Sequence, residues 1–194
     1  MKIYDISQEV FSCEVYQGDP APERSIVTST ENGDLYNLTA FSMCAHNGTH
    51  IDAPFHFLRD GKKVDEIPLY KFVGSCEVVE FDGVMTEFDA ESILKNTKSE
   101  RLLFKGKTIV SSDSAKVFAK SGICLLGVES QSVGDENAPM KAHIELLSEE
   151  VVLLEGIRLK CVPSGKYFLC AQPLLLGGSD GAPCRAILID FAQS

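Results

Sequence analysis

Short apolar runs recur along the whole chain, separated by polar or glycine-containing segments. They occupy residues 2–6, 25–28, 36–43, 76–81, 102–104, 123–128, 151–154, 167–171 and 186–189. Most of these runs have the length and the β-branched or aromatic content of β-strands. The pattern therefore predicts a protein rich in strands.

Helical patterning is weaker and occurs in three segments, residues 89–95, 113–120 and 139–149. The first carries Glu91 and Lys95 four positions apart, the second opens on Asp113 as a capping residue, and the third begins with Pro139. Strands outnumber helices and the two do not alternate strictly. We therefore expect an α+β (α/β) fold with a mixed or antiparallel sheet, flanked by a few helices.

The bulk composition is that of one folded domain. A chain of 194 residues with 44% hydrophobic and 24% charged residues can bury a substantial core, so we expect a single domain over residues 1–194. The net charge of −10 would repel nucleic acid and anionic membranes, so neither is expected as a partner.

The location predicted from the sequence is cytoplasmic. The N-terminal segment lacks the apolar core of a signal peptide, and no apolar run approaches the ~20 residues that span a bilayer. Seven cysteines are present, an odd number without a Cys-x-x-Cys pair. That usage favours free thiols in a reducing compartment over disulfides or a zinc ribbon.

Three of the chain's four histidines lie close together, at His46, His50 and His56, with Asp52 among them. Imidazole nitrogens and a carboxylate form a ligand set for zinc, or for manganese or iron. All four numbers are even, so in an extended chain the four side chains would share one face. Any one histidine is as readily an ordinary core or surface residue, but the cluster favours a metal site.

The spacing requires a bend in this segment. In a straight strand His46 and His50 would lie roughly 13 Å apart, too far to share one ion. Gly48 permits the bend that would bring them together. A helix would also join them, but Gly48 and Pro54 argue against it. Three protein ligands plus water would make a catalytic site and four would make a structural one, and spacing does not decide between them.

Two further residues have both an ordinary and a functional interpretation. His143 lies among apolar residues of a predicted helix, as a buried helix-face histidine would, or it is a ligand. Glu155 ends an apolar strand, where a carboxylate either meets solvent or projects into a site.

Residues 46–56, His-Asn-Gly-Thr-His-Ile-Asp-Ala-Pro-Phe-His, closely resemble the His-x-Gly-Thr-His-x-Asp-x-Pro-x-His signature of the metal-dependent cyclase and kynurenine formamidase family. The resemblance extends to residues 5–7, 18–20, 127–133, 143, 154–156 and 178–186, and so spans nearly the whole chain. It implies a sheet-rich, barrel-like core and a dimer or larger homo-oligomer.

The resemblance also implies roles for individual residues. His46, His50 and Asp52 would hold a first metal ion, and Asp52 would bridge to a second ion completed by His143 and Glu155. The residue at the position of His56 acts as acid and base in the family. Zinc is the expected metal, as one or two ions, although some members use a single manganese ion.

The activity implied is that of an arylformamidase, which releases formate from the small-molecule amide N-formylkynurenine by metal-activated water. The chain departs from relatives that carry Trp-Pro before Gly-Asp, because it contains no tryptophan. A wall against the aryl ring would have to come from Tyr16, Phe55, Phe57 or another residue. Gly18, Asp19 and the loop 177–183 either line the pocket or are plain turns.

Two other functions fit the same residues. The first keeps the metal and changes the substrate to a cyclic amide, imide or lactam, as in the isatin hydrolases to which this family extends. The second is a metal-binding or ligand-binding domain without turnover, whose saturated ion would contribute folding energy directly. Glu129 stands where relatives commonly have Asp.

Overall fold

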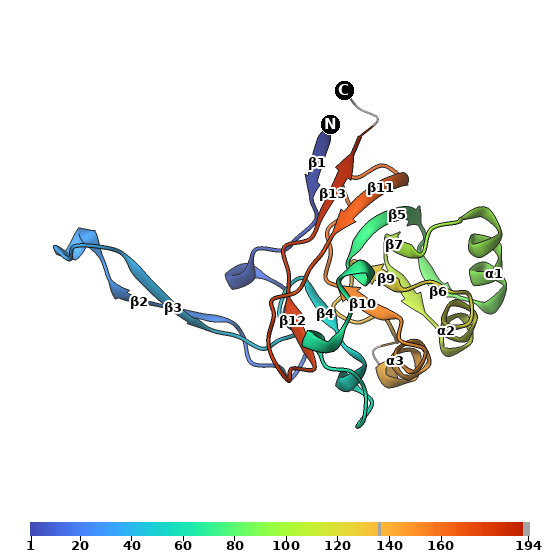
Figure 1. Ribbon diagram of the computed structural model, residues 1–194, viewed down its shortest axis with the longest axis horizontal. Helices are drawn as coiled ribbons and strands as arrows, with labels where there is room; N and C mark the ends of the chain where they lie inside the picture. The colour runs from blue at the N-terminus through green and yellow to red at the C-terminus, as the bar shows by residue number, and fades with distance from the viewer. Residues whose placement is uncertain (136, 192–194) are drawn as a thin grey trace.

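The computed structural model describes residues 1–135 and 137–191. Its main feature is a nine-stranded sheet that curls around a core, as Figure 1 shows. The strands in spatial order are β1 (Lys2–Asp5), β13 (Ile187–Asp190), β11 (Gly165–Cys170), β5 (Val73–Glu80), β7 (Arg101–Lys105), β9 (Leu125–Val128), β10 (Val152–Glu155), β4 (His50–Asp52) and β12 (Gly181–Pro183).

The sheet is mixed, as predicted. Strands β5, β7, β9 and β10 run parallel, whereas both ends of the sheet are built from antiparallel pairs. Strand β1 pairs with β13, so the two termini of the chain meet in one sheet. A two-stranded parallel sheet of β6 (Gly83–Met85) and β8 (Thr108–Val110) adjoins the helical side of the molecule (Figure 1).

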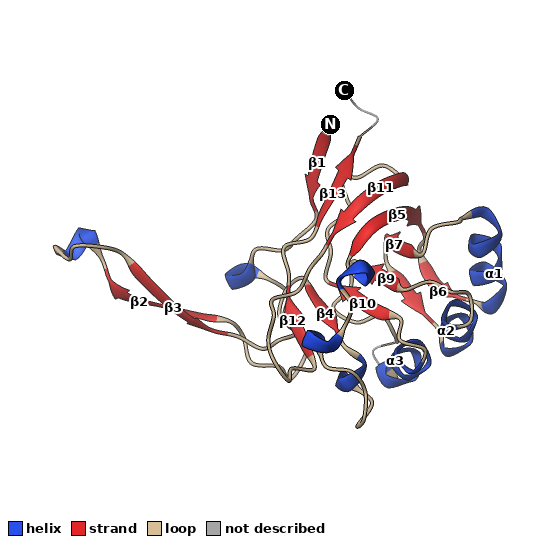
Figure 2. Cartoon of the chain, viewed as in Figure 1, coloured by secondary structure: helices blue, strands red, loops and turns tan. Residues whose placement is uncertain are grey.

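Three α-helices cover one side of the sheet (Figure 2). They are α1 (Glu87–Asn96), α2 (Ser112–Ala119) and α3 (Pro139–Ser148), and all three were predicted. Thr86 caps α1 through a reciprocal capping box with Asp89. Asp113 is not the cap of α2, because Ser111 accepts the backbone N–H of Ser114. Asp113 lies in the first turn, where its charge suits the helix dipole.

Apolar residues pack on both faces of the sheet. One cluster, with Ile51, Leu103 and Leu154, fills the side away from the helices. The other, with Leu102, Phe118 and Leu153, lies between the sheet and the helices. Alternation along the strands separates the two sets, because successive side chains point to opposite faces.

Two strands project away from this body as a hairpin, which we call the arm. It consists of β2 (Glu23–Thr28) and β3 (Leu38–Ser42), joined across a short 3-10 helix (Thr30–Asn32). Figures 1 and 2 show it extending far from the sheet. Nearly all of its side chains are exposed, including Ile26, Leu35 and Phe41.

All nine of the predicted runs contain a strand, with ends shifted by at most three residues. The sequence did not predict β4, β6, β8 or β12, each of which is three residues long. Further 3-10 helices lie at Val10–Ser12, Pro54–His56, Val64–Glu66 and Leu69–Lys71. No helix in the described part of the chain is long and apolar enough to cross a membrane.

Candidate metal centre

The short strand β4 places two of the predicted ligands on one face of the sheet. Ile51 points into the core away from the helices, so its neighbours His50 and Asp52 point to the opposite face. Strand β10 runs antiparallel beside β4, with Glu155 directly opposite His50. The register between two strands thus brings together residues that lie far apart in sequence.

His46 reaches the same place by a turn. Gly48 adopts a left-handed φ of 67°, and the rings of His46 and His50 come within 5.1 Å of each other, centre to centre. The predicted bend at Gly48 is therefore present. The shared face of an extended segment is not, because only residues 50–52 form a strand and His56 lies in a 3-10 helix.

Helix α3, which packs on the same face of the sheet, carries His143. Its Nδ1 lies 2.8 Å from the carbonyl oxygen of Pro139, and Nδ1 of His50 lies 3.0 Å from that of Gly48. A carbonyl oxygen only accepts hydrogen bonds, so in both rings Nδ1 carries a proton and donates it. In a neutral ring Nε2 then has a free lone pair, the form that binds metals.

Both Nε2 atoms face carboxylate oxygens. His50 Nε2 lies 3.3 Å from Asp52 Oδ1 and 3.4 Å from Glu155 Oε2. His143 Nε2 lies 3.5 Å from Asp52 Oδ2 and 3.2 Å from Glu155 Oε1. Every one of these side chains is at most 3% exposed. Lone pairs that face one another in a buried site are stable only when a cation lies between them.

When no metal is bound, a proton on each of the two rings takes the place of this cation. Burial opposes the charge, but hydrogen bonds to Asp52 and Glu155 outweigh it and raise the pKa of His50 and of His143 to about 10. Burial also opposes ionisation of the two carboxyls. Their contacts with the histidines nevertheless hold the pKa of Asp52 well below its usual range and lower that of Glu155.

The donor atoms are arranged as a metal site requires. One set of three, His46–His56–Asp180, has ligand atoms that all lie within 4.8 Å of one another. The same holds for two further sets, His46–His50–Asp52 and Asp52–His143–Glu155. Asp52 belongs to both sets, and its Oδ2 is buried without a hydrogen bond. Imidazole and carboxylate are ligands for zinc and manganese, so the residues fit one divalent ion or two.

His56 lies beside the ligands and contacts a residue that the sequence did not single out. Asp180 Oδ2 is 3.1 Å from His56 Nδ1 and 2.9 Å from His46 Nε2. Asp180 precedes β12, and its carbonyl oxygen accepts the N–H of Ala53. The loop 177–183 was expected to line the pocket or form a plain turn, and the only sequence signal for Asp180 was the family resemblance around it.

Close packing of β12 holds this arrangement. A side chain at Gly181 would come within 2.7 Å of His46 Cε1 and of the Ile51 carbonyl oxygen. Only glycine allows the backbone to approach the imidazole so closely.

A cavity of about 240 Å³ opens onto the cluster. The residues that line it are Tyr16, Asp19, His46, His50, His56, Phe57, Gln131, Ser132, Pro139, His143 and Glu155. The expected substrate contacts Tyr16, Asp19 and Phe57 are among them. Gly18 is not, and its φ of 100° marks it as a turn residue. Of the aromatic side chains considered as a wall, Phe55 faces Lys63 instead.

Glu129 has a role in the fold. Its Oε2 accepts the N–H of Gly106 and its Oε1 accepts that of Leu159. Both bonds tie the end of β9 to neighbouring loops. The residue does not line the cavity, so its difference from relatives lies away from the site.

Known proteins resemble this chain in sequence and in fold. The family model described as putative cyclase matches residues 4–135. A kynurenine formamidase from Salinibacter ruber is 34% identical over 208 aligned residues, which cover 98% of each chain. A solved structure described as a potential metal-dependent hydrolase with cyclase activity superposes with a TM-score of 0.83 at 31% identity, over 96% of each chain.

An isatin hydrolase bound to thioisatinate shares the fold alone, with a TM-score of 0.86 at 16% identity over 96% of this chain and 91% of its own. Fold and donor set together are those of a metal-dependent hydrolase. The chain belongs to the cyclase family.

Proposed function

We propose that this protein is an arylformamidase-like amide hydrolase, which converts N-formylkynurenine and water to kynurenine and formate in tryptophan catabolism. One observation carries the proposal. Two buried histidines and two buried carboxylates point their lone pairs at one another beside a cavity, an arrangement that calls for a divalent cation. The similarity to kynurenine formamidases over nearly the whole chain supports the substrate.

Zinc is the proposed metal, with manganese as the other choice, in one or two ions per chain. His46, His50 and Asp52 would hold the first ion, and Asp52, His143 and Glu155 the second. A bound divalent ion makes water acidic enough to attack at neutral pH and polarises the carbonyl under attack. The protein's own part is to fix Nδ1 as the donating nitrogen of His50 and His143, through the carbonyl oxygens of Gly48 and Pro139, so that Nε2 is the atom turned towards the ion.

His56 is proposed as the acid and base. Its Nδ1 donates to Asp180, which leaves Nε2 free to take a proton from the attacking water and return it to the leaving nitrogen. The side chain is 26% exposed, so it can reach a substrate in the cavity. Tyr16 and Phe57 supply aromatic surface at the cavity wall, and Asp19 a carboxylate.

The test is an assay of N-formylkynurenine hydrolysis, in which the product kynurenine is monitored by its absorbance. Zinc-loaded and manganese-loaded protein are compared with chelated protein. Rapid turnover that the chelator abolishes is expected. A protein that binds zinc and unfolds on its removal, yet hydrolyses neither formamides nor cyclic amides, would instead be a metal-binding domain without turnover.

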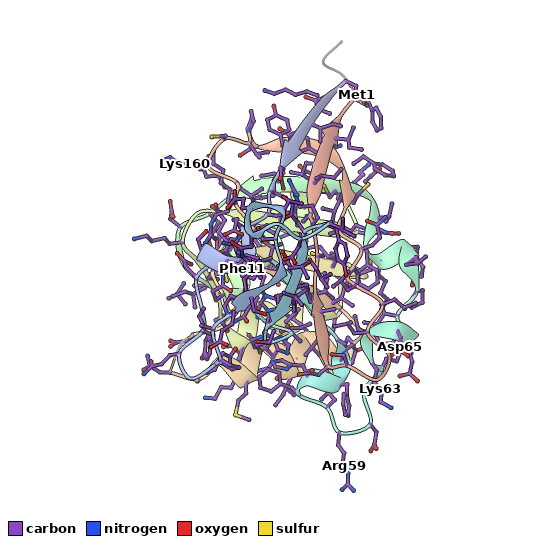
Figure 3. The ribbon with its side chains drawn as sticks, turned by 90° about the vertical axis from the view of Figure 1, so that its left-hand side faces the viewer. Met1, Phe11, Arg59, Lys63, Asp65 and Lys160 are labelled. Carbon is purple, nitrogen blue, oxygen red and sulfur yellow. The ribbon has the colours of Figure 1, made fainter. Side chains whose placement is uncertain are left out.

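We further propose a homo-oligomer, a dimer or larger, in which the arm contacts a second copy of the chain. A two-stranded ribbon is at best marginally stable alone, and this one exposes Ile26, Leu35, Tyr36 and Phe41. At the base of the arm lies a groove of about 870 Å³, lined in part by Phe11 and Phe41. Figure 3, which views the molecule from the arm's side, shows Phe11 near the centre of this face.

The proposed setting is the cytoplasm, with the whole chain acting as one domain. All seven cysteines are free, which suits a reducing compartment. The pairing of β1 with β13 supports one domain, because the sheet needs both ends of the chain. Small-molecule amides are the proposed partners.

A further inference from the structure

The amide of Gln131 has no hydrogen-bond partner among the described residues. Its Oε1 and Nε2 are both buried, and the residue lines the same cavity as the proposed metal ligands and His56. A buried carboxamide that is left unpaired is destabilising, so native structures almost always provide a partner. Gln131 forms part of the cavity wall, so a molecule bound in the cavity would lie against this residue.

The loop that carries Gln131 is held on both sides of it. The carbonyl oxygen of Ser130 accepts the N–H of Gly156 at 2.8 Å, and the N–H of Val133 donates to Glu155 Oε1 at 2.7 Å. Gln131 is therefore tied by its neighbours to the end of β10, next to a proposed metal ligand. These bonds fix the backbone on both sides of Gln131 beside the site.

A second glutamine, Gln8, also lies beside Gly156, and its hydrogen bonding differs from that of Gln131. A Cβ built on Gly156 would lie 2.6 Å from Nε2 of Gln8 and 2.7 Å from Nε2 of Gln131. The amide of Gln8 is fully engaged, because Nε2 donates to Gly156 and Oε1 accepts from Glu14. Gln8 thus completes the structural contacts there, and the fold makes no such use of Gln131.

We propose that Gln131 is a specificity-determining residue, which pairs its Nε2–H and Oε1 with the C=O and N–H of a substrate amide in the cis form. This inference rests on the proposed function and names the shape of amide that the site accepts. A carboxamide presents its donor and its acceptor side by side. It can satisfy both atoms only against a partner that does the same.

Amide geometry decides which substrates provide that partner. In a trans secondary amide the N–H and C=O point in opposite directions, so one glutamine reaches only one of them. A ring holds the amide cis, with both groups on one edge, whereas a linear amide must be rotated into that form at a free-energy cost. Cyclic aryl amides therefore match Gln131 without rearrangement, and a linear formamide is bound as its cis form.

Binding of two lactams to zinc-loaded protein tests the inference. Oxindole offers a cis N–H and C=O, and N-methyloxindole lacks the N–H. Wild type is expected to bind oxindole about tenfold more tightly, as loss of a buried hydrogen bond implies. In Gln131→Leu the preference should disappear. Gln131→Glu loses the donor, so it should bind oxindole more weakly than wild type.

The ratio of the oxindole affinity to the N-methyloxindole affinity is compared between wild type and each variant. The steric effect of the methyl group is the same in every variant and therefore cancels in this comparison. Asn96→Leu, which deletes an exposed amide at the end of α1, should behave as wild type. Zinc content and melting temperature of Gln131→Leu establish that the site is intact. Equal binding of the two lactams by wild type, or discrimination that persists in Gln131→Leu, would overturn the inference.

Failure of the proposed function gives a different result. A wild-type protein that does not hydrolyse N-formylkynurenine but still separates the two lactams through Gln131 would retain the inference and lose the formamidase assignment. A protein that hydrolyses N-formylkynurenine, but whose preference between the two lactams does not depend on Gln131, would retain the formamidase assignment and lose the inference.

Discussion

His56 and Asp180 form a pair across the site, with Nδ1 of the ring 3.1 Å from Oδ2 of the carboxylate. The same oxygen lies 2.9 Å from Nε2 of His46, and the two rings stand 4.1 Å apart, centre to centre. One carboxylate oxygen thus accepts from the proposed acid/base and from a proposed metal ligand. Such a contact sets both tautomers and orients both rings.

Asp180→Ala should lower kcat by about 10- to 100-fold, the usual effect of losing a partner that orients a metal-bound histidine. Asp180→Asn should lose less, because its oxygen still accepts hydrogen bonds, although without charge. Rates at saturating N-formylkynurenine, with zinc affinity measured in parallel, check this. The surface variant Asp113→Asn is the control, and wild-type rates in Asp180→Ala would refute the role.

His56→Asn should reduce turnover by about 10²- to 10⁴-fold, the range for loss of a general acid/base. Zinc should remain bound at wild-type stoichiometry, because the two proposed ligand sets do not include His56. Metal analysis alongside steady-state rates separates the two effects. Loss of zinc together with activity would make His56 a ligand.

Glu155→Gln should reduce the number of bound ions by one. Glu155 belongs only to the second set of donors, whereas Asp52 belongs to both, so Asp52→Asn should weaken both ions. The zinc-to-protein ratio after dialysis, measured for wild type and both variants, gives the outcome. A ratio of one in wild type that Glu155→Gln leaves unchanged would point to a single ion held by the first set.

Metal-free protein should lose stability as the pH rises from about 6.5 towards 10. Burial opposes protonation of His50 and His143, but their carboxylate partners raise both pKa values to about 10 in the folded state, above the ~6.5 of an unfolded histidine. The stabilisation is therefore complete below pH 6.5 and disappears as the pH passes the folded pKa.

Melting temperatures of metal-free and zinc-loaded protein across that pH range give the measurement. The zinc-loaded form should show a much flatter profile, since the cation between the carboxylates is then an ion that does not titrate. Parallel profiles for the two forms would contradict this account of the site.

The sequence predicted which donor residues would lie together better than it predicted their geometry. Gly48 was correctly identified as the bend that joins His46 to His50, because an extended chain keeps them too far apart. Strand β4 was missed, since three residues are too few to show alternation. The approach of Glu155 to His50 depends on the register between two strands, which no local pattern encodes.

Asp180 and Gln131 were not singled out from the sequence, although both lie in segments that carry the family resemblance. Each lies on a loop whose composition is explained by turns. Gln131 lines the cavity, and its neighbours bond to the end of β10, whereas Asp180 contacts His46 and His56 and bonds through its carbonyl oxygen to Ala53. The helices, by contrast, were predicted because caps and periodicity are local signals. Only the cap of α2 was misassigned, with Ser111 two residues ahead of Asp113.

Charge placed on the arm should dissociate the proposed oligomer. Leu35 is 97% exposed and Ile26 is 68% exposed, so Leu35→Lys and Ile26→Lys disturb no core. A second copy of the chain could not cover either lysine without burying an unpaired charge. Light scattering after gel filtration should show a mass reduced to one chain. Phe88→Lys, on an equally open apolar side chain of α1, should keep the wild-type mass. A wild-type protein that is already monomeric would refute the proposed oligomer, and an oligomer that survives both charges would place its interface elsewhere.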